Sequence, residues 1–109
     1  MQVMQPQSRL RMRKTRIEAK MDIIRRHYVF FGDVQGVGFR YRAYHAAAYY
    51  GISGWVKNCY DGSVELEAEG TPKEIDDMLL AIEKGHYIRI EDFRVREIPL
   101  RNSHSFEIR

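Results

Sequence analysis

Three glycines within seven residues, at positions 32, 36 and 38, separate two regular patterns in the chain. The run RHYVFF at 26–31 is rich in aromatic and β-branched residues, which is typical of a central strand. After the glycines, apolar residues recur at helical spacing until Gly51, a C-terminal stop signal. These apolar residues are Phe39, Ala43, Ala46, Ala47 and Tyr50. The sequence therefore predicts a strand that enters a helix directly through a glycine-rich loop.

A second strand and a hairpin are predicted next. ISGWVKN at 52–58 reads as a strand, and Asp61-Gly62 is a strong turn signal before a third strand at 63–69. In that third strand, Val64, Leu66 and Ala68 alternate with Glu65, Glu67 and Glu69. Strict alternation of this kind predicts one buried face and one wet face lined by the three glutamates.

The remaining segments predict a second helix and two more strands. Thr71, Pro72 and Glu74 form an N-cap, a first-turn proline and a capping box, and Gly85 ends the helix. The stretch 87–98 is extended, but its apolar positions switch parity, so a β-bulge is expected near Glu91 and Asp92. A short closing strand is predicted at 105–109.

The order βαββαβ, with an extra terminal strand, predicts an α+β fold of the ferredoxin-like class, an antiparallel sheet with two helices on one face. The first two strands are joined by a helical crossover and so run parallel, with the third strand between them. Their C-terminal ends lie on the same edge of the sheet. We therefore expect the glycine-rich loop and Asn58 to be neighbours in space.

The net charge of +3 belongs to the N-terminus. Residues 1–20 hold six of the 18 Lys and Arg and one of the 15 Asp and Glu, which leaves 12 cations and 14 anions afterwards. We interpret 1–22 as a basic, disordered extension and 23–109 as the single domain that this length allows. An arm that touches nucleic acid is the alternative interpretation.

The lone Cys59 and the lack of a long apolar segment are consistent with a reducing cytoplasm and with no membrane span. The four histidines are scattered without metal-ligand spacing, so neither a metal nor a cofactor is expected. The chain is expected to be a monomer.

The segment 32–40 has the features of an anion site. A glycine-rich connection brings several backbone N–H groups to the positive end of a helix dipole. Arg40 is a cation in the first helical turn, where the macrodipole disfavours it unless an anion lies between the two. The segment lacks the lysine of a Walker A loop, and Tyr41 occupies the place of the third glycine of a dinucleotide fingerprint.

The segments GDVQGVGFR and YGISGWVKNCYDGSVELEAEG resemble the acylphosphatase family across about residues 26–109. The resemblance implies hydrolysis of acyl phosphates, with Arg40 binding the phosphoryl group and Asn58 holding the attacking water. It also implies that the backbone N–H groups of Val34, Gln35, Gly36, Val37, Gly38 and Phe39 bind the phosphate. Inorganic phosphate is then both product and inhibitor. Asp33 departs from the family, in which a basic residue is common at that place.

Two alternatives stay open from the sequence. The same domain could bind an acyl or carbamoyl phosphate without hydrolysing it, as an accessory module. A nucleic-acid-binding ferredoxin-like module is the other, but Glu65, Glu67 and Glu69 would then line an open sheet face with negative charge.

Overall fold

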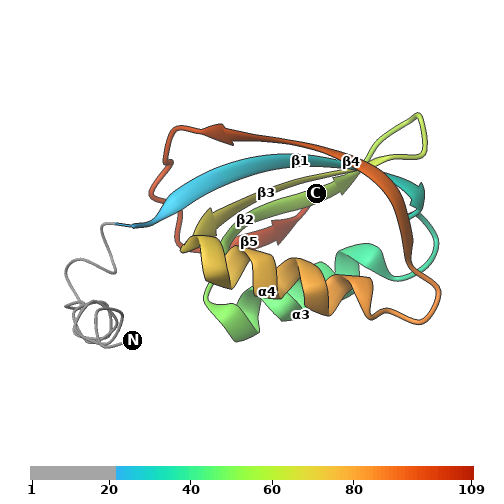
Figure 1. Ribbon diagram of the computed structural model, residues 1–109, viewed down its shortest axis with the longest axis horizontal. Helices are drawn as coiled ribbons and strands as arrows, with labels where there is room; N and C mark the ends of the chain where they lie inside the picture. The colour runs from blue at the N-terminus through green and yellow to red at the C-terminus, as the bar shows by residue number, and fades with distance from the viewer. Residues whose placement is uncertain (1–21) are drawn as a thin grey trace, which may run out of the picture.

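The structure is a computed structural model that describes residues 22–109. The predicted N-terminal extension, 1–22, lies outside the described residues except for Asp22. Figure 1 shows a single sheet with two helices beneath it. The elements are β1 (Ile24–Asp33), α3 (Phe39–Tyr50), β2 (Ser53–Asn58), β3 (Val64–Gly70), α4 (Pro72–Glu83), β4 (Arg89–Ile98) and β5 (Phe106–Ile108).

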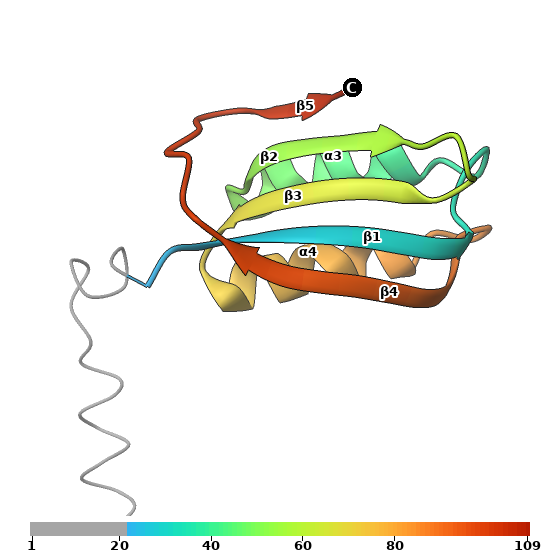
Figure 2. The same cartoon turned by 90° about the horizontal axis from the view of Figure 1, so that it is seen from above.

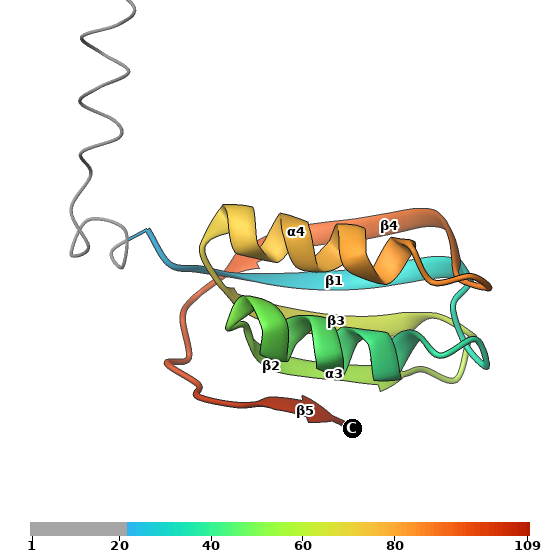
Figure 3. The same ribbon diagram turned by 90° about the horizontal axis from the view of Figure 1, so that it is seen from below.

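The strands lie in the order β4-β1-β3-β2-β5, as Figure 2 shows. β3 pairs antiparallel with both β1 and β2, so β1 and β2 run parallel as the crossover required. β5 pairs with β2 in the parallel direction, which makes the five-stranded sheet mixed. Both helices cover the same face of the sheet (Figure 3). The ferredoxin-like prediction with an extra C-terminal strand is confirmed.

The core lies between the sheet and the helices. Alternate residues of β1 and β3 enter it, and Phe30 packs against Phe39 of α3 with ring centroids 5.3 Å apart. α4 begins at the predicted capping box, where Glu74 N donates to Thr71 Oγ1 and Thr71 N donates to Glu74 Oε1, each at 3.2 Å. The helix ends at Glu83. The two helices therefore form where the local signals placed them.

The predicted bulge is present in β4. Phe31 pairs with Asp92 and Gly32 pairs with Ile90, which leaves Glu91 as the extra residue. Gly32 has φ +126, and a Cβ there would collide with the carbonyl oxygen of Arg89. The bulge explains the switch of apolar parity, and it requires glycine at the point where β1 turns toward the loop.

The prediction that the three glutamates of β3 lie on a wet face is wrong for two of them. Glu67 and Glu69 are buried, each 7% exposed, against Arg25, which is 2% exposed. Arg25 Nη2 lies 2.9 Å from Glu67 Oε1, and Arg25 Nη1 lies 3.1 Å from Glu69 Oε1. β3 is an inner strand, so the long side chain of Arg25 on β1 can lie across both carboxylates.

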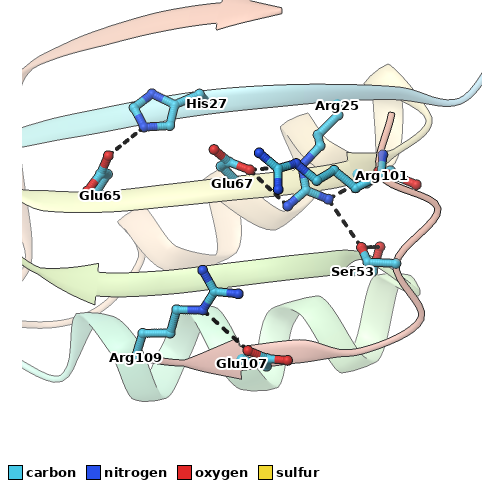
Figure 4. Close-up of polar contacts among 10 residues, drawn as sticks. Arg25, His27, Ser53, Glu65, Glu67, Arg101, Glu107 and Arg109 are labelled. Atoms are coloured by element: carbon cyan, nitrogen blue, oxygen red, sulfur yellow. Dashed lines mark hydrogen bonds and ion pairs between the residues drawn. The ribbon is translucent and has the colours of Figure 1, made fainter. Parts of the chain in front are cut away.

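The connection 99–105 contacts this cluster at the end of the strands, where the close-up in Figure 4 shows Arg101 beside Arg25. Arg101 N donates to Glu69 Oε1 at 2.9 Å. Arg25 Nη1 donates to Ser103 Oγ at 3.1 Å, and Ser103 Oγ lies 2.8 Å from Ser53 Oγ. The buried ion pairs thus attach the chain segment that leads into β5 to the sheet.

We predict that Arg25→Met lowers the free energy of unfolding by about 3 kcal/mol, because it leaves two carboxylates buried without their cation. Urea denaturation of the two proteins measures the difference. Lys73→Met is the control: Lys73 is 84% exposed and pairs with Asp77 on the surface, so its loss leaves stability nearly unchanged. Equal stability of the Arg25 variant and the parent would contradict a stabilising role for the buried ion pairs of Arg25.

Candidate active site

The loop 34–38 connects β1 to α3 and presents the N-terminus of α3. Gly36 has φ +73 and Gly38 has φ +85, both in the left-handed region that glycine enters at little cost. Gly38 is the N-cap of α3; no side chain caps the helix, and its first turn contains no acidic residue. The N–H groups of the first turn are therefore not capped by a side chain of the helix and are available to bind an anion.

Arg40 is the second residue of α3 and is exposed. Within residues 22–109 its side chain forms no hydrogen bond or ion pair with another residue. A guanidinium at a helix N-terminus is disfavoured by the macrodipole, and here no carboxylate compensates it. The arrangement is that of a cation available to an oxyanion.

Asn58 is the last residue of β2 and pairs with Val64 of β3. Its side-chain oxygen Oδ1 is buried and has no hydrogen-bond partner among the described residues. A buried acceptor without a partner is rare in folded proteins and is often matched by a water or a ligand. This oxygen is therefore a candidate acceptor for a water molecule.

A pocket of about 320 Å³ brings these groups together. It contains Arg40 and Asn58, as expected from the parallel direction of β1 and β2. Asp33, the acidic departure from the family, is not among its lining residues. The lining residues are Val34, Gly36, Gly38, Phe39, Arg40, Tyr41, Asn58 and Ile108.

Two of the predicted backbone ligands do not line the pocket. Val37 is half-buried and packs against the core, and the side chain of Gln35 is hydrogen-bonded to the hairpin after β2. A larger hollow of about 740 Å³ lies around the C-terminal end of α3, but it contains neither Arg40 nor Asn58. The smaller pocket is the candidate site because it holds the cation, the free acceptor and the loop together.

Sequence reasoning missed Tyr41 and Ile108 as lining residues. Ile108 reaches the pocket because β5 pairs with β2, where it lies opposite Val56. The alternation of Phe106 and Ile108 predicts a strand, but the partner of that strand is far away in the sequence. Tyr41 directly follows Arg40 in the sequence, and this position was the only feature of the sequence that could have placed it at the site.

The hairpin after Asn58 is closed by local hydrogen bonds. Ser63 donates to Asp61 Oδ1 from its backbone N at 3.0 Å and from its hydroxyl at 2.6 Å, and these bonds lower the pKa of Asp61. Cys59 N donates to Ser63 O at 2.9 Å. These hydrogen bonds close the turn that follows Asn58 at the end of β2.

A second carboxylate near this hairpin belongs to Glu65, which lies on the face of the sheet away from the helices. Its Oε2 lies 2.7 Å from His27 Nε2, and this hydrogen bond is the main reason that the pKa of Glu65 lies below its usual value. Glu65 is thus ionised and engaged outside the pocket, where it cannot act as a base toward a ligand bound at Arg40.

Comparison with known proteins gives one consistent result. The sequence profile of the acylphosphatase family matches residues 26–108. The acylphosphatase of Clostridium acetobutylicum is 46% identical over 79 residues, which cover 71% of this chain and 87% of the relative.

Solved structures agree with the sequence comparison. This chain superimposes on the crystal structure of acylphosphatase from Bacillus subtilis with a TM-score of 0.73 and 36% sequence identity. The match covers 78% of this chain and 97% of the Bacillus subtilis chain. A full-length HypF in its phosphate- and nucleotide-bound form has a TM-score of 0.72 and 32% identity. That match covers 79% of this chain but 12% of HypF.

Proposed function

Because the chain belongs to the acylphosphatase family, we propose that Arg40 and those backbone N–H groups of 34–39 that reach the pocket bind the phosphoryl group while Asn58 positions the attacking water. The chain is a hydrolase that converts an acyl phosphate to a carboxylate and inorganic phosphate. The observation that carries the assignment of roles is the Oδ1 of Asn58, unpartnered among the described residues, in the same pocket as the guanidinium of Arg40.

The reaction makes modest demands on the protein. An acyl phosphate is a mixed anhydride whose leaving group is a carboxylate, a weak base that departs without a proton from a general acid. In the transition state the negative charge of the phosphoryl group is spread over its oxygens, where Arg40 can contact two of them at once and the loop N–H groups can contact the others. The site therefore needs positive charge and a fixed geometry more than it needs acid–base groups.

Asn58 fits the remaining task. Its amide oxygen can accept a hydrogen bond from water and so aim a lone pair of the water at phosphorus. A neutral amide does not deprotonate the water strongly, but a loose transition state with little bond formation to the nucleophile does not require that. Positioning alone then accounts for the rate contribution of Asn58.

We predict that the chain releases phosphate from acetyl phosphate at the same rate with and without an excess of chelator. The reason is that Arg40 and the loop N–H groups already supply the positive charge that a metal would bring to the phosphoryl oxygens. The measurement is initial phosphate release in metal-free buffer. Loss of activity in chelator, with recovery on adding Mg²⁺, would contradict it.

The sequence left open a second candidate, a domain that holds an acyl or carbamoyl phosphate without hydrolysing it, and the similar segment of HypF belongs to a protein solved with phosphate and nucleotide bound. The same assay separates the two functions. Multiple turnovers above the uncatalysed rate support hydrolysis, whereas a single stoichiometric binding event without release supports the accessory function.

We expect inorganic phosphate to inhibit competitively, since it is the product and fits the same loop. We also propose that residues 23–109 carry the activity as a monomer in the cytoplasm. Within 22–109, no helix has the length and apolar character to span a bilayer.

A further inference from the structure

The side chain of Gln35 lies between the two halves of the candidate site without entering the pocket. We propose that Gln35 is a positioning residue: it sets the placement of the water-holding Asn58 relative to the phosphate-binding loop. This inference rests on the proposed function of Asn58, and it assigns to Gln35 a role distinct from that of its backbone N–H.

The contacts of Gln35 are specific. Its Nε2 donates to Cys59 O at 2.7 Å and to Ser63 O at 2.8 Å, so both donors of the amide are used. Cys59 follows Asn58 directly, and Cys59 N donates to Ser63 O across the neck of the hairpin. The amide of Gln35 is therefore hydrogen-bonded to the backbone at the point where β2 ends and the turn begins.

The groups of the site come from two separate chain segments. The phosphate-binding groups all belong to 34–40, and the proposed water-holding group belongs to β2. Within residues 22–109, the side-chain hydrogen bonds that join the loop 34–38 to the segment 58–63 are the two that Gln35 donates. Besides the pairing of β1 and β2 with β3, this one side chain therefore ties the position of Asn58 to the phosphate-binding loop.

The shape of the loop itself has other supports. Val34 is 1% exposed and anchors the start of the loop in the core, and Gly36 and Gly38 provide its left-handed turns. Arg42 N donates to Gly38 O at 3.0 Å and starts the helix. Losing the Gln35 amide should therefore leave the phosphate-binding loop intact, while the end of β2, which carries Asn58, loses one of its supports.

The consequence is a split between catalysis and binding. A displacement of about 1 Å between reacting groups can cost about a hundredfold in rate. For Gln35→Met, which keeps the side-chain length but removes both donors, we expect kcat to fall by about tenfold to a hundredfold. The inhibition constant of inorganic phosphate should change little, because the ligands of the phosphate stay in place.

A double-mutant cycle with Asn58→Ala tests whether Gln35 acts through Asn58. If it does, adding Gln35→Met to Asn58→Ala causes no further loss of kcat. An equal loss in both backgrounds, or normal kcat in Gln35→Met, overturns the inference. Normal turnover of Asn58→Ala alone would instead overturn the role of Asn58 in the proposed function, so the two failures are distinguishable.

Two further variants keep the test decisive. Thr71→Ala removes the cap of α4 far from the site and costs about 1 kcal/mol of stability, so it shows what destabilisation alone does to kcat. Gln35→Asn keeps an amide on a shorter side chain that cannot reach both carbonyls, and replaces Gln35→Met if that variant does not fold. We expect it also to lower kcat, with phosphate inhibition retained; an unchanged kcat overturns the inference here as well.

Discussion

Replacing Arg40 with Gln should lower the turnover of acetyl phosphate by about 10³-fold or more, the scale on which a single arginine acts in phosphoryl transfer. The variant keeps a polar, hydrogen-bonding side chain but shortens it and removes its charge. In the described part of the chain, Arg40 is the one cation among the pocket-lining residues. Its loss leaves the loop N–H groups alone against the charge of the phosphoryl oxygens.

Inhibition by inorganic phosphate should weaken together with turnover in the Arg40 variant, because ground state and transition state share the same contact. Arg94→Gln is the matched control: Arg94 lies over the ring of Phe31, with its guanidinium carbon 5.4 Å from the ring centroid, and does not line the pocket. The control should keep normal turnover and normal phosphate inhibition. Undiminished phosphate inhibition in Arg40→Gln would place the binding site elsewhere.

Arg40→Lys refines the same prediction. A lysine restores the charge, but its ammonium is a point donor that cannot contact two phosphoryl oxygens as a planar guanidinium does. We expect this variant to regain part of the phosphate inhibition and little of the turnover. Full recovery of both would mean that charge alone, without the paired contact, accounts for the role of Arg40.

The parts of the site that could be predicted from sequence depend on local chemistry and on chain direction. Glycines at 36 and 38 mark left-handed positions wherever the chain goes, and the crossover through α3 makes β1 and β2 parallel. Parallel strands end at the same edge, so Asn58 had to lie near the loop. The bulge at Glu91 was equally local, since one extra residue in a strand moves every later side chain to the opposite face.

The parts that sequence reasoning missed depend on what covers a face. Alternation along β3 correctly separates its two faces, but it cannot show that Arg25 and the connection 99–105 close over Glu67 and Glu69. The same limit applies to Ile108, whose place in the pocket follows from the pairing of β5 with β2. Each depends on contacts between segments that are far apart in the sequence.

Gln35 shows a different limit. The sequence motif places it among loop residues whose backbone N–H groups face a ligand, and its side chain carried no signal of its own. Only the structure shows that this side chain donates to the carbonyls of Cys59 and Ser63. A motif identifies the residues that belong to one site, whereas the contacts show whether the side chain or the backbone of each residue acts there.

Replacing Asn58 with Ala should separate catalysis from binding. Removing one positioned hydrogen-bonding group at a reacting centre costs about 10²- to 10³-fold in rate, and we expect the upper end of that range. The inhibition constant of inorganic phosphate should barely change, because Asn58 is assigned to the water and Arg40 to the phosphate. Initial rates and phosphate inhibition, with the folded fraction measured by circular dichroism, provide the test.

The competing hypothesis is that Asn58 only stabilises the turn after β2, in which case its loss lowers the melting temperature and leaves kcat unchanged. Asp61→Ala is the matched control, because it removes the two hydrogen bonds from Ser63 in the same hairpin without touching the pocket. We expect that variant to be less stable and to keep most of its kcat. A folded Asn58→Ala protein with near-normal turnover would remove Asn58 from the mechanism, whereas a folded, phosphate-binding and inactive one is the result that the unpartnered Oδ1 predicts.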